Sequence, residues 1–126
     1  PAKGTVSNRR IFVKVDSNSG LPDGLAVDAE GFVWSAEWYG SCIKRYDPDG
    51  KLQSKVMLPA KQTSSLAFGG PELTDIFVTS AAKSEPMPVM PPGYDPNSGY
   101  IGGALFRLRQ AVAGRLEYRA AIRIGH

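Results

Sequence analysis

An internal repeat constrains the fold of this chain more than any other feature. Three segments recur in the same order: residues 25–27 as 66–68, residues 32–36 as 76–80, and residues 43–46 as 105–108. The offsets are 41, 44 and 62 residues, and an inserted segment lengthens the last one. A period of about 40–45 residues that carries four strands is typical of propeller blades. The repeat therefore favours a β-propeller over a β-sandwich, which is the alternative all-β arrangement.

Nine short runs of β-branched and aromatic residues, each bounded by turn residues, predict nine strands. They are residues 10–15, 24–28, 32–37, 42–46, 52–58, 64–68, 75–80, 104–109 and 116–124. No segment shows the sustained period of a helix. We therefore predict an all-β fold, a partial β-propeller with about two four-stranded antiparallel blades plus one extra strand.

The repeat also divides the single predicted domain, residues 1–126, into parts. Residues 1–19 are expected to form the last strand of a preceding blade, residues 20–59 the first full blade, and residues 60–126 the second. The second blade contains a proline-rich insertion, residues 82–102. Because proline lacks a backbone donor, this insertion is predicted to pass over one rim and not to join a central strand.

Composition excludes several classes of function. Fifteen Lys and Arg against twelve Asp and Glu give a net charge of +3, and the basic residues are spread along the chain, which argues against nucleic-acid binding. The only histidine is His126, which excludes most Ser-His-Asp, Cys-His and multi-histidine zinc sites. No apolar stretch approaches the ~20 residues of a membrane span. Cys42 is the only cysteine, so no internal disulfide can form and we expect a cytoplasmic protein.

The alternation of strands assigns the connections to two rims. The turns at residues 29–31 and 47–50 share one rim, where three carboxylates are predicted to form turns: Asp28, Asp47 and Asp49. The connections at residues 21–24, 38–41 and 60–63 share the other rim with the insertion. This rim is chemically richer, with a carboxylate, two aromatic residues and an amide. Because binding sites usually form on loops above a rigid scaffold, we expect the ligand site there.

A series of short motifs resembles the senescence marker protein, gluconolactonase and luciferin-regenerating enzyme family. The motifs lie in order at residues 7–10, 20–31, 33–36, 45–50, 65–70, 76–81 and 102–106. The resemblance covers nearly the whole chain and corresponds to the C-terminal half of a family member. It implies a six-bladed propeller that binds a divalent metal, often calcium or zinc, on the central axis. Many members hydrolyse sugar lactones.

The resemblance implies that Asp23 is a metal ligand and a candidate base for the attacking water. The strand alternation independently places Asp23 at the start of an innermost strand, where it can face the axis. The alternative is a turn residue, because Pro22-Asp23-Gly24 is common turn chemistry. The expected substrate-binding residues on the same rim are Trp38, Tyr39 and Gln62, because flat apolar faces suit sugar rings.

Three residues near this rim are expected to be structural. Trp34 is expected to pack between blades, although it is also a candidate for the sugar pocket. Glu37 is expected to be an exposed partner in a salt bridge at the rim. Cys42 is expected to behave as a small buried hydrophobe.

These features predict a divalent-metal-dependent sugar lactone hydrolase, or a piece of one. By resemblance, the other metal ligands are a glutamate and an asparagine that have no counterpart in these 126 residues. We therefore expect a homo-oligomer, or further N-terminal blades in a longer parent protein, with a small sugar lactone as substrate. The alternative is a non-catalytic truncated propeller module that acts in binding or oligomeric assembly.

Overall fold

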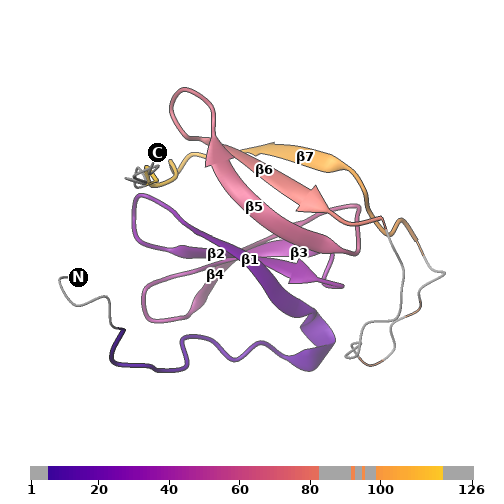
Figure 1. Ribbon diagram of the computed structural model, residues 1–126, viewed down its shortest axis with the longest axis horizontal. Helices are drawn as coiled ribbons and strands as arrows, with labels where there is room; N and C mark the ends of the chain where they lie inside the picture. The colour runs from indigo at the N-terminus through magenta and orange to yellow at the C-terminus, as the bar shows by residue number, and fades with distance from the viewer. Residues whose placement is uncertain (1–5, 83–91, 93–94, 96–98, 118–126) are drawn as a thin grey trace, which may run out of the picture.

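The computed structural model describes residues 6–82, 92, 95 and 99–117. They form two antiparallel sheets of four and three strands, arranged as neighbouring blades that do not close on themselves (Figure 1). The strands are β1 Leu21–Val27, β2 Val33–Trp38, β3 Cys42–Tyr46, β4 Leu52–Met57, β5 Thr63–Gly69, β6 Asp75–Ser80 and β7 Leu105–Arg109. The all-β fold class is therefore confirmed.

Each strand pairs with the next one along the chain, in the orders β1-β2-β3-β4 and β5-β6-β7. This meander needs only short connections, because antiparallel neighbours can be joined by tight turns. At one such turn, Oδ1 of Asp47 accepts hydrogen bonds from the backbone N–H groups of Asp49 at 3.0 Å and Lys51 at 2.9 Å. The predicted turn role of Asp47 is confirmed.

Seven of the nine predicted strands are present, and the exceptions lie at the two ends. Residues 10–15 were predicted to be a strand, and this is wrong: they are irregular and lead to a short 3-10 helix, η1 Ser17–Ser19. Of the predicted strand 116–124, Leu116 and Glu117 are irregular and the remainder lies outside the described residues, as does most of the insertion. No helix in the described ranges is long and apolar enough to cross a membrane.

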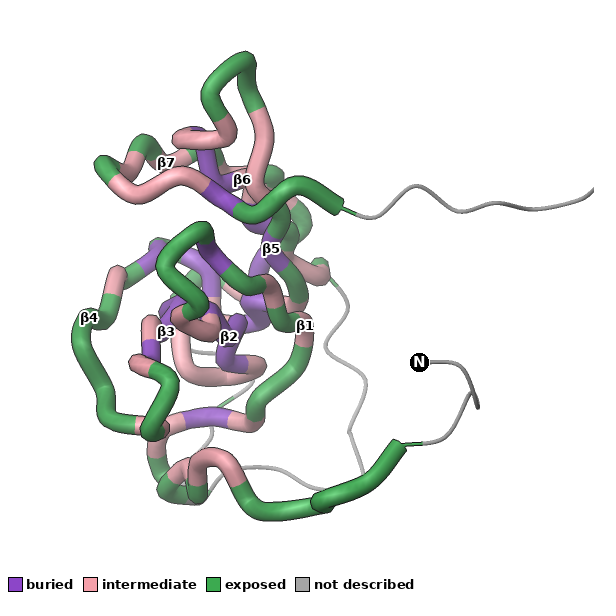
Figure 2. Tube along the Cα trace, turned by 90° about the vertical axis from the view of Figure 1, so that its left-hand side faces the viewer, coloured by how far each residue is buried: buried purple, intermediate pink, exposed green. Residues whose placement is uncertain are grey.

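The hydrophobic core lies between the two sheets (Figure 2). Its buried members are Trp34, Ala36, Ile43, Leu58, Leu66, Ile76 and Val78. On β2 and β6 they alternate along the strand, because successive side chains of a strand point to opposite faces. The Trp34 and Phe68 rings meet edge to face with centroids 6.1 Å apart, which joins the first sheet to the second. The expected packing role of Trp34 between blades agrees with this contact.

Candidate functional site

Asp23 lies inside strand β1, at a β-bulge. Pro22 pairs with Glu37 and Leu25 pairs with Ser35, so two residues of β1 stand opposite one residue of β2. A bulge of this kind bends its strand and redirects a side chain, and bulges are frequent beside active sites. The turn interpretation of Pro22-Asp23-Gly24 is therefore wrong, because these residues shape the start of an inner strand.

Gly24 allows the inner strands of the two sheets to touch. A side-chain carbon at Gly24 would lie 2.6 Å from Cα of Ser65 on β5, and also against its Oγ. Because a backbone atom cannot move aside alone, any larger residue at this position must push β1 and β5 apart. The glycine of the Pro-Asp-Gly motif thus allows the two neighbouring sheets to approach each other closely.

A pocket of about 300 Å³ opens beside Asp23 and is lined also by Leu21, Pro22 and Trp38. Its wall is mainly apolar, and among the described residues that line it the Asp23 carboxyl is the one ionisable group. Asp23 is exposed as a whole, and the partial burial of its carboxyl raises its pKa above the ordinary value because the apolar wall disfavours the charged form. A carboxylate beside an indole matches a sugar-like ligand, whose hydroxyl groups need polar partners and whose ring presents an apolar face.

Tyr39 and Gln62 both adjoin Trp38. Tyr39 has a φ of 63°, and its ring meets the Trp38 ring edge to face with centroids 5.5 Å apart. Gln62 pairs with Trp38 through an isolated β-bridge and is fully buried. The structure thus brings together the three residues that the sequence predicts for substrate binding. The Gln62 amide, however, is not open to a ligand in this arrangement, because both of its polar atoms are buried.

The oxygen of Asp23 suits a hard divalent cation, but the surrounding side chains do not complete a coordination sphere. Calcium takes six to eight oxygen ligands, with carboxylates prominent among them. Within the part of the chain that the structure describes, no group of three or more His, Cys, Asp or Glu side chains could hold a metal ion. Asp23 therefore fits a cation as one member of a larger ligand set.

Glu37 is fully buried, so the expectation of an exposed carboxylate at the rim is wrong. Glu37 lies inside β2, and the chain turns back over it at Gly40, where a side-chain carbon would lie 2.6 Å from Cβ of Glu37. Its Oε2 lies 3.4 Å from Nζ of Lys44, which is also nearly buried. Burial raises the pKa of Glu37, and the attraction of Lys44 offsets this only in part. Glu37 and Lys44 thus form a buried ion pair between β2 and β3.

Asp28 forms a turn as predicted, but it also anchors side chains at the rim opposite Asp23. Its Oδ1 accepts hydrogen bonds from the backbone N–H groups of Glu30 and Phe32, both at 3.0 Å. Its Oδ2 accepts from Nε1 of Trp34 at 2.9 Å and from Nε of Arg45 at 2.8 Å. The four hydrogen bonds meet the hydrogen-bonding needs of the Asp28 carboxylate, and they explain why it can be fully buried.

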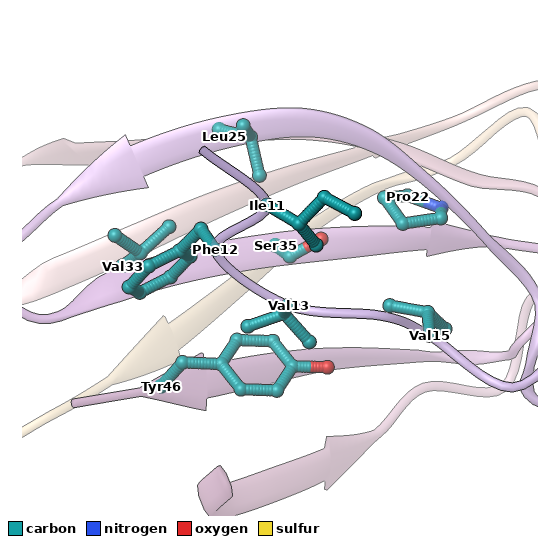
Figure 3. A pocket seen from close by; sticks show the side chains of 9 residues that line it. All are labelled: Ile11, Phe12, Val13, Val15, Pro22, Leu25, Val33, Ser35 and Tyr46. Atoms are coloured by element: carbon teal, nitrogen blue, oxygen red, sulfur yellow. The ribbon is translucent and has the colours of Figure 1, made fainter. Parts of the chain in front are cut away.

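A second cavity, of about 240 Å³, lies between the N-terminal segment and the first sheet (Figure 3). Ile11, Phe12 and Val13 extend over Leu25 and Tyr46 there. Burial, together with the nearby Glu37 charge, raises the pKa of Tyr46 to about 12, so its hydroxyl stays protonated at neutral pH. The described residues of this lining include no carboxylate or imidazole, and the Tyr46 hydroxyl is their one ionisable group.

The second sheet carries a polar residue at the equivalent bulge, which sequence reasoning did not single out. Ser64 is the extra residue of a bulge in β5, since Thr63 pairs with Ser80 and Ser65 pairs with Thr79. The repeat offset of 41 residues aligns Ser64 with Asp23. That alignment could have indicated Ser64 from the sequence alone.

Known proteins resemble the chain over most of its length. The family model of the SMP-30/Gluconolactonase/LRE-like region matches residues 1–82. Pentonolactonase XacC of Haloferax volcanii is 41% identical over 122 residues, which is 97% of this chain and 41% of that protein. Two solved structures share the fold over 90% of this chain and 37% of theirs. A luciferin-regenerating enzyme has a TM-score of 0.77 at 28% identity, and a calcium-binding protein, regucalcin, from Agrobacterium tumefaciens has a TM-score of 0.68 at 32% identity.

The 126 residues thus span about two fifths of the length of these relatives. The family model covers well over half of the chain, and the matched residues include Asp23, Trp38 and the β5 bulge. The chain belongs to the SMP-30/gluconolactonase/LRE-like family.

Proposed function

We propose that this chain contributes two blades to a divalent-metal-dependent sugar lactone hydrolase, with Asp23 as a metal ligand and as the carboxylate that activates water. The observation that carries the proposal is the position of Asp23, at a bulge on an inner strand and in a pocket with Trp38. The similarity to a pentonolactonase supports the reaction class, and the similarity to a calcium-binding regucalcin supports a divalent metal.

Hydrolysis of a lactone adds water to the ester carbonyl and breaks the C–O bond of the ring, which gives a hydroxy acid. A cation bound at Asp23 would polarise the carbonyl and stabilise the negative charge that develops on its oxygen. One oxygen of Asp23 would hold the cation while the other accepts a hydrogen bond from the attacking water. The Asp23 carboxylate would accept the proton of the water as the new C–O bond forms.

Trp38 and Tyr39 would contact the sugar. The Trp38 indole lines the pocket beside Asp23 and can pack against the apolar face of a sugar ring. Tyr39 supports the indole from the side through its edge-to-face contact. Gln62 lies buried next to Trp38, so we assign it the role of supporting the indole unless ligand binding opens the rim.

The remaining ligands of the cation would come from copies of this chain or from further blades of a longer protein. Large apolar side chains on the first sheet are exposed, with Leu25 62% and Met57 60% accessible. Exposed apolar surface of this kind often marks an interaction site. Light scattering of the purified chain with and without calcium tests this: a discrete oligomer that calcium tightens supports self-assembly, whereas a calcium-indifferent monomer contradicts it.

The reaction is tested by following acid release from gluconolactone in the presence of calcium or zinc. Asp23→Asn should abolish metal-stimulated hydrolysis, and Trp38→Ala should raise KM more than it lowers kcat. Asp49→Asn, in an exposed turn on the opposite rim, is the matched control and should retain the activity. Equal activity of the wild type and Asp23→Asn, or no metal stimulation, would contradict the proposal.

A further inference from the structure

The internal repeat places an exposed leucine and a buried leucine at equivalent positions of the two sheets. The offset of 41 residues aligns Leu25 on β1 with Leu66 on β5. Leu66 is only 5% exposed, because the face of the second sheet that carries it packs against the first sheet. Leu25 is 62% exposed. The face of the first sheet that carries Leu25 is therefore equivalent to a covered face, but no sheet covers it among the described residues.

The converse relationship holds for the other two faces. The offset of 62 residues aligns Ile43 on β3 with Leu105 on β7. Ile43 is fully buried in the core between the sheets, whereas Leu105 is 64% exposed. Because successive side chains of a strand point to opposite faces, Leu105 points away from the core that Phe106 contacts. The second sheet thus carries Leu105 on a face that is equivalent to the covered face of the first sheet.

These two uncovered faces are the outer faces of the sheets. The outer face of the first sheet carries three exposed apolar side chains, Leu25, Val27 and Met57, and that of the second sheet carries Ala67 and Leu105. By the repeat, the outer faces are related to each other as the two buried faces are. They cannot meet within one chain, because its two sheets already pack through their inner faces. A second copy of the chain can bring them together.

The N-terminal segment covers the outer face of the first sheet only in part. Phe12 and Val13 lie over Tyr46, and a cavity of about 240 Å³ remains between them and the sheet (Figure 3). Ile11 is itself exposed. Residues 10–15 have no strand partner among the described residues, so side-chain contacts hold them in place and no ladder of hydrogen bonds does. A partner can therefore displace this segment at less cost than a paired strand.

We propose that the outer face of the first sheet binds the outer face of the second sheet in another copy of this chain. Leu25 of one copy and Leu105 of the other would then share a core, as Leu66 and Ile43 do within the chain. The contact continues the packing of sheet on sheet that each chain already contains. Since every copy presents both outer faces, the contact is head-to-tail, and a ring forms where the rotation between copies closes. This assembly goes beyond the proposed function, because it needs neither the cation nor lactone hydrolysis.

Analytical ultracentrifugation of the 126-residue chain without added metal measures the association. The wild type should form oligomers at micromolar concentration. Leu25→Asp and Leu105→Asp should each weaken association about 100-fold, because each places an unpaired charge in an apolar contact. Tyr100→Asp is the matched control and should associate like the wild type, since Tyr100 is also exposed and apolar but lies outside both sheets.

A mixture of the two variants distinguishes a head-to-tail contact from other modes of assembly. Leu25→Asp keeps an intact outer face on its second sheet, and Leu105→Asp keeps one on its first sheet. The two variants should therefore form a one-to-one dimer that grows no further. Recovery of association in the mixture also shows that both variants are folded, and circular dichroism checks each variant alone.

Four outcomes would overturn the proposal. One is a wild type that stays monomeric, which would leave further blades of a longer protein as the source of the missing ligands. Another is a mixture that does not associate although the wild type does. The third is loss of association in Leu25→Asp but not in Leu105→Asp, which indicates that two identical faces meet. The fourth is loss of association in Phe12→Ser, because loosening the N-terminal segment should not weaken a contact that displaces it.

The metal site can fail without affecting this assembly. Asp23→Asn should associate like the wild type in the absence of metal, even where it abolishes hydrolysis. Loss of association in Asp23→Asn would overturn the assignment of the contact to the two outer faces.

Discussion

Trp34 donates a hydrogen bond of 2.9 Å from Nε1 to Oδ2 of Asp28, and both residues are almost wholly removed from solvent. The same carboxylate oxygen accepts from Nε of Arg45 at 2.8 Å. A residue that follows β1 thus connects a core side chain of β2 to a cation of β3. We expect the stability of the first sheet to depend on this junction.

Asp28→Ala is expected to lower the free energy of unfolding by about 3 kcal/mol, because it leaves a buried indole N–H without its acceptor and removes one of the two carboxylates that the partly buried Arg45 guanidinium contacts. Denaturant unfolding followed by tryptophan fluorescence measures this change. Asp49→Ala, in an exposed turn, should alter stability by less than about 0.5 kcal/mol. A loss below about 1 kcal/mol in Asp28→Ala would show that water replaces the carboxylate at little cost.

The stability of the chain should decline in acid because of Asp28. Burial alone would raise the pKa of Asp28, but the hydrogen bonds from Trp34 and Arg45 and from the Phe32 backbone outweigh burial and hold the pKa below its ordinary value. A carboxyl whose pKa is lower in the folded state stabilises the fold above the unfolded pKa, near 3.9. That contribution is lost as the pH falls through the folded pKa.

Asp28→Asn removes this titration. The difference in unfolding free energy between the wild type and Asp28→Asn should therefore be largest near neutral pH and shrink toward about pH 2. Denaturation at a series of pH values measures the difference. A difference that is constant across the series would show that Asp28 does not titrate differently in the folded and unfolded states.

Removing one member of the buried Glu37–Lys44 pair should destabilise the fold more than replacing both members. Lys44→Met leaves the Glu37 carboxylate buried without a cation and is expected to cost about 3 kcal/mol. Adding Glu37→Gln should recover most of that loss, because no buried charge remains. A double-mutant cycle measures the coupling. Additive effects of the two substitutions would mean that Lys44 and Glu37 do not interact across their 3.4 Å separation.

Gly24→Ala should destabilise the chain by about 2 kcal/mol, because the added carbon would lie 2.6 Å from Cα of Ser65. Ser65→Ala should not rescue it, since the obstacle includes the Ser65 backbone. Thermal unfolding of the two single variants and the double variant measures both effects. Full stability in Gly24→Ala would show that β1 and β5 can separate without cost.

Composition and turn chemistry predicted the strands, because short β-branched and aromatic runs form β2 and β6 and because Asp47 and Gly50 mark a tight turn. They did not predict the behaviour of residues 10–15, which have strand-like composition. In the structure these residues pack apolar side chains over the first sheet and have no strand partner among the described residues.

The site was predicted less well than the strands. Residues 21–23 were assigned to a loop because Pro-Asp-Gly favours turns, whereas Leu21 pairs with Trp38 and Pro22 with Glu37 in the first sheet. Glu37 was expected at the surface because charged side chains are seldom buried, but Lys44 lies beside it. Both errors concern contacts between strands, which local propensity does not encode. Ser64 was missed for a different reason, since the repeat was used to place strands and not to compare residues at equivalent positions.

The contact between Gly24 and Ser65 also fixes the residue type at the junction of the two sheets. A carbon added at position 24 would overlap Ser65, so glycine is the residue that lets β1 and β5 run at this spacing. Asp23 precedes that glycine on the same strand and lines the pocket beside Trp38. The spacing of the two sheets and the position of the candidate carboxylate are therefore set by adjacent residues of one strand.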